Sequence, residues 1–97
     1  MKFHKLKTDP QLFDCVLNDC KTVEIRFNDR GYEVGDYLLL RRTQWTGRQM
    51  KDGAALVYTG THILAKISHV QSEIGLLEGW LALSIKILDT GNEYRTE

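Results

Sequence analysis

The densest run of residues that could do chemistry lies between positions 20 and 30. Glu24 and Arg26 are two residues apart, so on a strand their side chains share one face and could pair with each other or with a ligand. The run also contains one lysine before this pair and three polar residues after it, namely Lys21, Asn28, Asp29 and Arg30. The alternative interpretation is an ordinary solvated strand face, where an exposed ion pair contributes about 0–1 kcal/mol. Composition alone favours that alternative.

The segment that carries this pair, residues 22–27, alternates strictly between apolar and polar side chains, which is typical of a half-buried strand. Its apolar face consists of Val23, Ile25 and Phe27, and we expect all three to be buried against a helix. Neither Arg26 nor Arg30 is expected in the core.

The only proline begins the only helix that the sequence predicts, over residues 10–19. Asp9 can cap this helix by accepting a backbone N–H, and Pro10 suits its first position because that N–H would have no partner. At about 100° per residue, five side chains fall within one arc about 140° wide. They are Leu12, Phe13, Val16, Leu17 and Cys20.

The rest of the chain reads as strands over residues 2–8, 37–40, 61–70 and 80–88. In the last two, the residues expected to face inward are Ile63, Ala65, Ile67, Leu81, Leu83, Ile85 and Ile87. Residues 43–60 are weakly patterned and are expected to form an insertion or a hairpin loop, with Asp52-Gly53 as its turn. The sequence therefore predicts the α+β class, as a small, partly closed β-barrel of five or six strands with one main helix.

Length and charge limit the possibilities further. The 97 residues suffice for one domain, which we place at 1–88 with a polar tail at 89–97. A formal net charge of zero argues against capture of duplex DNA by bulk positive charge, although it allows a local basic site. No segment approaches the roughly 20 apolar residues of a membrane helix, and the start of the chain does not resemble a signal peptide. We therefore expect a cytoplasmic monomer with no membrane association and with reduced cysteines.

Two weaker signals have simpler interpretations. Two cysteines and three histidines have no paired short spacing, so we expect no metal and no cofactor. Around Trp45, a basic stretch formed by Arg41, Arg42, Arg48 and Lys51 could stack on bases and bind phosphate, although a charged hairpin face explains it as well. Trp80 is expected in the core or at its rim.

Several short motifs, in order along the chain, resemble the ASCH branch of the PUA-like superfamily. The clearest is Lys-x-x-Glu-x-Arg at 21–26, followed by Asn-Asp-Arg at 28–30 and Val-Gly-Asp at 34–36. His-Lys-Leu-Lys at 4–7 and Gly-Trp at 79–80 complete the pattern. Within that branch the chain resembles a small bacterial and phage domain family of unknown function.

The resemblance implies a PUA-like barrel with a cleft beside the helix that binds RNA or a modified nucleotide. Its expected binding residues are Lys21, Glu24, Arg26, Asn28, Asp29 and Arg30. Arg26 and Arg30 could clamp phosphate or stack on a base, while Glu24 and Asn28 could hydrogen-bond to a base edge.

Two alternatives remain open. Some relatives in the wider superfamily are amidohydrolases that act on an acylated cytosine nucleoside, which would make Lys21 and Glu24 catalytic. Those relatives carry threonine where this chain has Glu24, and a carboxylate beside Lys21 favours the charged ammonium over the base, so we expect weak or absent hydrolysis. The other alternative is a phage or bacterial protein-interaction domain.

Overall fold

The computed structural model describes residues 1–92, which form five strands and two short helices. In chain order the elements are β1 (Phe3–Thr8), α1 (Pro10–Leu17), β2 (Val23–Phe27), β3 (Tyr37–Thr43), α2 (Gly47–Lys51), β4 (Tyr58–Gln71) and β5 (Trp80–Asn92). The last strand is longer than predicted and continues to Asn92, because it pairs with β4 along most of its length. The remainder of the predicted tail lies outside the described residues.

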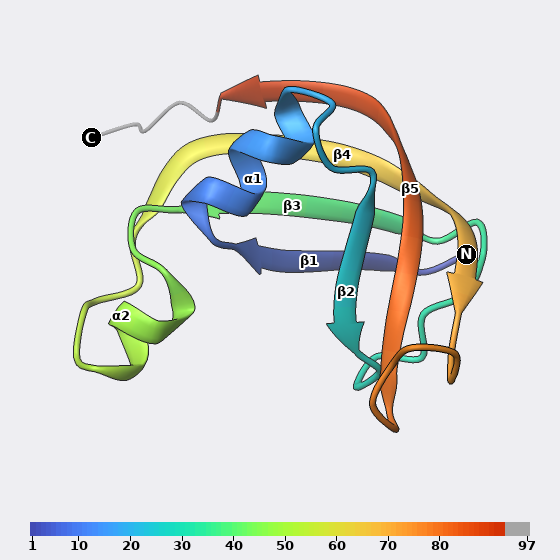
Figure 1. Cartoon of the computed structure of the whole chain (residues 1–97). Coiled ribbons are helices and arrows are strands. Elements are labelled where there is room, and N and C mark those ends of the chain that lie inside the picture. The colour runs from blue at the N-terminus through green and yellow to red at the C-terminus, as the bar shows by residue number, and fades with distance from the viewer. Residues whose placement is uncertain (93–97) are drawn as a thin grey trace.

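The strands form one curled sheet in the order β1-β3-β4-β5-β2. β1 pairs with β3 in parallel, and the other three pairings are antiparallel. The long strands β4 and β5 bend, so β2 and part of β5 cross in front of β1 and β3 (Figure 1). The sheet is therefore a half-barrel whose two edge strands are β1 and β2, which confirms the predicted α+β class and partial closure.

The hydrophobic core lies on the inner face of the sheet, against α1. It consists of Leu6, Phe13, Val16, Tyr32, Leu38, Leu40, Ile63, Ala65, Ile67, Leu81, Leu83 and Ile85. The inward faces predicted for β4 and β5 are confirmed except at Ile87, which is 37% exposed. Ile87 pairs with Ala65 at a register shift in the β4–β5 ladder, where the regular alternation is interrupted.

Helix α1 is shorter and less buried than the sequence predicts. It ends at Leu17, and only Phe13 and Val16 of its expected apolar arc are buried. Leu12 and Leu17 are exposed because the half-barrel covers a narrower stripe of the helix than the arc provides. Asp19 adopts a left-handed conformation, with φ of 60°, where the chain turns from α1 towards β2.

The expectation of a single main helix is wrong, because residues 47–51 form α2 where a hairpin turn was expected. The Thr46 hydroxyl accepts the Gln49 backbone N–H, and the Gln49 side chain accepts the Thr46 backbone N–H, which makes a capping box. Asp52 and Gly53 end this helix instead of joining two strands. Asp9 lies at the N-cap of α1, but its carboxylate accepts the Gly47 backbone N–H rather than a bond from α1.

The largest difference from the prediction is the orientation of β2. Its apolar residues Ile25 and Phe27 are 49% and 51% exposed, whereas Glu24 is only 2% exposed. The β5 pairing explains this inversion, because Glu24 and Arg26 lie opposite Leu83 and Leu81, two inward-facing core residues. The predicted burial of Val23, Ile25 and Phe27 against α1 is therefore wrong, and the charged face of β2 points into the half-barrel.

Candidate functional site

Glu24 is a buried carboxylate that two cationic side chains surround. Its Oε2 lies 2.5 Å from Lys21 Nζ, and its Oε1 accepts Arg26 Nη2 at 2.8 Å and Nε at 3.2 Å. The Glu24 side chain is 3% exposed, while those of Lys21 and Arg26 are each 24% exposed. A carboxylate buried without partners would be strongly destabilising, so these two cations allow Glu24 to face inward. We refer to Lys21, Glu24 and Arg26 as the Glu24 cluster.

Arg26 also connects the two edges of the sheet. Its Nη1 and Nη2 each donate to the Lys7 carbonyl oxygen at 3.2 Å, and Nη2 lies 3.3 Å from Thr8 Oγ1. Lys7 and Thr8 belong to β1, the edge strand opposite β2. β1 and β2 do not pair with each other, so the half-barrel has a gap between them. The guanidinium group of Arg26 bridges this gap.

Two neighbouring hollows lie along this gap. The first, which we call the aromatic cleft, has a volume of about 390 Å³ and is lined by Leu6, Lys7, Ile25, Arg26, Phe27, Asp29, Arg30, Tyr32 and Trp80. The second, the Glu24 hollow, has a volume of about 320 Å³ and is lined by Lys7, Thr8, Asp9, Leu12, Lys21, Glu24, Ile25 and Arg26. Lys7, Ile25 and Arg26 line both, so the two hollows are direct neighbours.

An aromatic pair forms one wall of the aromatic cleft. Phe27 and Trp80 are direct partners in the β2–β5 ladder, and their rings meet edge to face with centroids 5.7 Å apart. Both rings remain accessible, since the residues are 51% and 38% exposed. Gly79 is required beside them, because its φ is +84° and a Cβ there would lie 2.8 Å from Phe27 Cε1. Trp80 thus forms part of the cleft wall.

The six predicted binding residues do not all meet in one place. Lys21, Glu24 and Arg26 form the Glu24 cluster, and Arg26, Asp29 and Arg30 line the aromatic cleft. Asn28 lies apart from both, in a hollow beside the β4–β5 connection. Its Oδ1 accepts the Tyr32 backbone N–H at 3.2 Å and so supports the turn after β2.

Six residues of the cleft lie outside the set of binding residues predicted from the sequence. They are Leu6, Lys7, Ile25, Phe27, Tyr32 and Trp80. Lys7 belongs to a motif that carried the resemblance, but nothing in the sequence shows that β1 lies across a gap from β2. The alternation of β2 predicts Phe27 in the core. Tyr32 is a buried residue of the cleft lining, and burial raises the pKa of its hydroxyl.

A second buried polar group fixes β1 to the loop that carries Tyr32. His4 Nε2 lies 2.9 Å from Asp36 Oδ2, and both residues are buried. The Asp36 carboxylate also accepts the backbone N–H groups of Lys2 and Glu33, each at 3.0 Å. Burial alone would raise the pKa of Asp36, but the hydrogen bonds from His4, Lys2 and Glu33 outweigh it and lower that pKa to about 2. The His-Lys-Leu-Lys and Val-Gly-Asp motifs thus meet in one structural contact.

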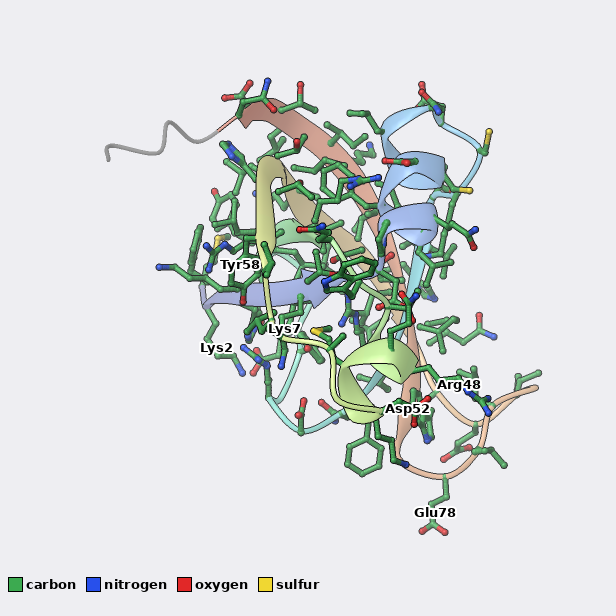
Figure 2. The ribbon with its side chains drawn as sticks, turned by 90° about the vertical axis from the view of Figure 1, so that its left-hand side faces the viewer. Lys2, Lys7, Arg48, Asp52, Tyr58 and Glu78 are labelled. Atoms are coloured by element: carbon green, nitrogen blue, oxygen red, sulfur yellow. The ribbon has the colours of Figure 1, made fainter. Side chains whose placement is uncertain are left out.

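The predicted basic stretch around Trp45 is not a single surface. The guanidinium of Arg41 lies 3.6 Å from the centroid of the Tyr58 ring. Arg42 Nε and Nη2 donate to the two carboxylate oxygens of Asp14 on α1, at 3.0 and 3.2 Å, and this hydrogen bonding lowers the pKa of Asp14. Arg48 lies on α2 (Figure 2), the helix that projects beyond the end of the sheet (Figure 1). These cations therefore serve different elements.

Among residues 1–92, no three His, Cys, Asp or Glu side chains gather closely enough to hold a metal ion. No helix in the same range has the length and apolar character needed to cross a bilayer.

The fold and the cleft together define a class: a small α+β half-barrel in which buried charges link the two edge strands. The chain belongs to the family described as a domain of unknown function, DUF3850, whose model matches residues 3–85. It is also similar to the "Uncharacterized 12.9 kDa protein in GpA 3'region" of Escherichia phage P2, with 34% identity over 82 residues. That match covers 84% of this chain and 66% of the phage protein, just under two thirds of its length. The expected relation to a bacterial or phage domain family is consistent with both findings.

Proposed function

We propose that this protein binds RNA, with an unpaired base or a modified nucleotide held in the aromatic cleft. The observation that carries the proposal is the accessible Phe27–Trp80 pair, which shares one cleft with Lys7 and Arg30. Single-stranded nucleic acid is bound by this combination, since a base stacks on an aromatic ring for about 1–3 kcal/mol while cations hold the phosphates. Phe27 and Trp80 supply the stacking surface.

Arg30 and Lys7 are the cations best placed to hold phosphate. Both residues are exposed, and Arg30 is only loosely associated with Asp29, with Nε and Oδ1 4.0 Å apart. Arg26 differs, because its guanidinium already bonds to Glu24, Lys7 and Thr8. We assign Arg26 and Glu24 the role of fixing the wall of the cleft.

This proposal includes membership of the ASCH branch of the PUA-like superfamily. The curled sheet supports it, as does the position of the Lys-x-x-Glu-x-Arg strand beside the hollows. In this chain the motif lysine and arginine both hold the motif glutamate. That arrangement accounts for the spacing of the three residues on a single strand and its flank.

Tryptophan fluorescence tests the proposal directly. Trp45→Phe leaves Trp80 as the single tryptophan, and mixed-sequence RNA of about twelve nucleotides should quench it, more strongly at low salt. Phe27→Ala in this background should weaken binding about tenfold or more, because one side of the stacking surface is lost. Leu56→Ala, at an exposed apolar residue outside the cleft, is the matched control and should leave affinity unchanged. Absence of quenching by any RNA, or equal affinity of the Phe27→Ala and Leu56→Ala proteins, would overturn the proposal.

The Glu24 hollow supports a second candidate, hydrolysis of an acylated cytosine nucleoside, because it brings Lys21 and Thr8 to one space. The contacts of Lys21 argue against it, since its Nζ donates to both Glu24 and the Val23 carbonyl oxygen. An ammonium held in this way is a poor base. We therefore expect no more carboxylate release from acylated cytidine with this protein than with its Lys21→Ala variant. Turnover that disappears in Lys21→Ala would favour the enzyme.

A further inference from the structure

The sheet separates charge in a way that the neutral overall composition conceals. Strands β1, β3, β4 and β5 together contain six Lys or Arg residues and, as far as Asn92, one acidic residue, Asp89. The six are Lys5, Lys7, Arg41, Arg42, Lys66 and Lys86. The other acidic residues of the described chain lie in β2, α1 and the connecting segments.

Four of these cations lie on the outer face of the half-barrel. Lys5 and Lys7 alternate along β1 with the buried residues Leu6 and Thr8, so they point away from the core. Lys66 alternates in the same way with Ala65 and Ile67, and Lys86 lies directly opposite Lys66 in the β4–β5 ladder. None of the four forms an ion pair within 4.0 Å among residues 1–92.

The Lys66–Lys86 pair is the most informative part of this surface. Like charges directly opposite each other destabilise a sheet, so the free protein bears a cost that a bridging anion would remove. The register continues this row across the sheet through Tyr37 to Phe3 on β1. Lys66 Nζ lies 5.5 Å from the centroid of the Tyr37 ring, and Phe3 is 54% exposed. Cations and accessible rings thus occur in one row, as they do on surfaces that follow a nucleic-acid strand.

We propose that this outer face, defined by Lys5, Lys7, Lys66 and Lys86, binds the phosphate backbone of the RNA whose base occupies the aromatic cleft. Lys7 connects the two regions, because it lies on the outer face of β1 and also lines the cleft. An RNA strand that leaves the cleft past Lys7 therefore meets Lys5 and then the row that contains Lys66 and Lys86. The inference rests on the proposed function and extends it, since it assigns a path for the strand beyond the bound nucleotide.

The experiment compares a short and a long RNA on variants of equal charge. Lys66→Gln/Lys86→Gln removes two cations from the outer face, and Arg48→Gln/Lys51→Gln removes two exposed cations from α2, which projects from the end of the sheet (Figure 1). Anisotropy of a labelled strand of about twelve nucleotides measures total binding, and Trp80 fluorescence with a trinucleotide measures occupation of the cleft.

We expect the Lys66/Lys86 variant to bind the long strand about tenfold more weakly, with a salt slope smaller by about 1.4, or 0.7 for each lost contact. Its affinity for the trinucleotide should be unchanged, and the α2 variant should match the parent protein with both RNAs. The thermal midpoint of the Lys66/Lys86 variant should not fall, because the two opposed lysines are removed.

The inference fails if the Lys66/Lys86 variant binds the long strand as the parent does, or if the α2 variant loses as much affinity. It also fails if Lys66 and Lys86 are needed for binding to anionic phosphatidylserine vesicles but not for binding to RNA. Each of these three results leaves the cleft proposal standing, provided that RNA still quenches Trp80. Failure of every RNA to quench Trp80 in the parent protein overturns the proposed function itself and the extension with it.

Discussion

Strands β2 and β4 alternate with similar regularity, yet they present opposite chemistry to the interior. In β4 the apolar residues Ile63, Ala65 and Ile67 are buried, and the polar ones face outward. In β2 the charged Glu24 is buried, and the apolar Ile25 and Phe27 are exposed. An alternating pattern therefore identifies a strand without determining which of its faces is buried.

The two strands differ because they occupy different places in the sheet. β4 is the central strand and pairs with β3 and β5, so its inner face lies within the core. β2 is an edge strand beside the gap, where Glu24 and Arg26 link it to Lys21 and β1. Its apolar residues are consequently available to line a cleft. The exposed ring of Phe27 is thus the counterpart of the buried carboxylate of Glu24.

The largest effect should come from the buried side of this comparison. Phe13→Ala removes a ring that is fully buried between α1 and the sheet and should reduce the free energy of unfolding by about 3–5 kcal/mol. Phe27→Ala should reduce it by no more than about 1 kcal/mol, because its ring is half exposed. Urea denaturation of both variants measures the difference. Equal losses would mean that Phe27 belongs to the core after all.

Glu24→Gln tests the inverted face of β2 itself. The amide keeps the shape of the side chain but leaves the ammonium of Lys21 and the guanidinium of Arg26 without their carboxylate, which should reduce stability by about 2–3 kcal/mol. Glu33→Gln, at a side chain that is 74% exposed, should change stability by less than about 0.5 kcal/mol. Comparable small effects for both would show that the Glu24 cluster is dispensable for the fold.

Acid should weaken the contact that holds β1 to the Tyr32 loop. The pKa of Asp36 is about 2 in the folded protein and 3.8 ordinarily, so its contribution is present above pH 4 and is lost as the pH falls from about 4 to 2. This depression corresponds to about 2 kcal/mol of stability at neutral pH. Urea titrations across that range should show the loss in the parent protein. If Asp36→Asn shows the same acid-dependent loss, another carboxyl group is responsible.

Gly79→Ala sharpens the comparison at the aromatic pair. Gly79 and Gly53 both have positive φ, at +84° and +114°, but only a Cβ at Gly79 meets a neighbour, Phe27. Gly53→Ala should therefore reduce stability by about 1 kcal/mol from backbone strain alone, and Gly79→Ala by about 1 kcal/mol more. Gly79→Ala should also weaken RNA binding, because it displaces the Phe27 ring. Identical stability and binding in the two variants would mean that Phe27 is not held as the structure shows.

The sequence predicts the elements better than it predicts their environment. Alternation identifies β2, β4 and β5, and Pro10 marks the start of α1. The capping box around Thr46 and Gln49 was also readable from the sequence and would have indicated α2. Such local signals act over a few residues, so they can be recognised without the fold.

The site depends on contacts between distant parts of the chain, and these could be predicted only in part. Lys21, Glu24 and Arg26 are close in sequence, so their grouping was foreseeable. Phe27 and Trp80 meet only because of the β2–β5 register, which no local pattern specifies. The same register turns Glu24 inward, so a single tertiary feature accounts for both the wrong face of β2 and the missed aromatic pair.

An amide-detected NMR titration with a mixed-sequence RNA pool tests the central claim most directly, because the two tryptophan indoles report on two different regions. The account predicts that the resonances of the Trp80 indole N–H and of the backbone amides of residues 26–30 shift progressively, whereas the resonance of the Trp45 indole N–H does not shift. It also predicts that the shifts diminish as salt rises from about 50 to 200 mM. No shift with any RNA, or shifts confined to Trp45 and α2, would contradict binding in the aromatic cleft.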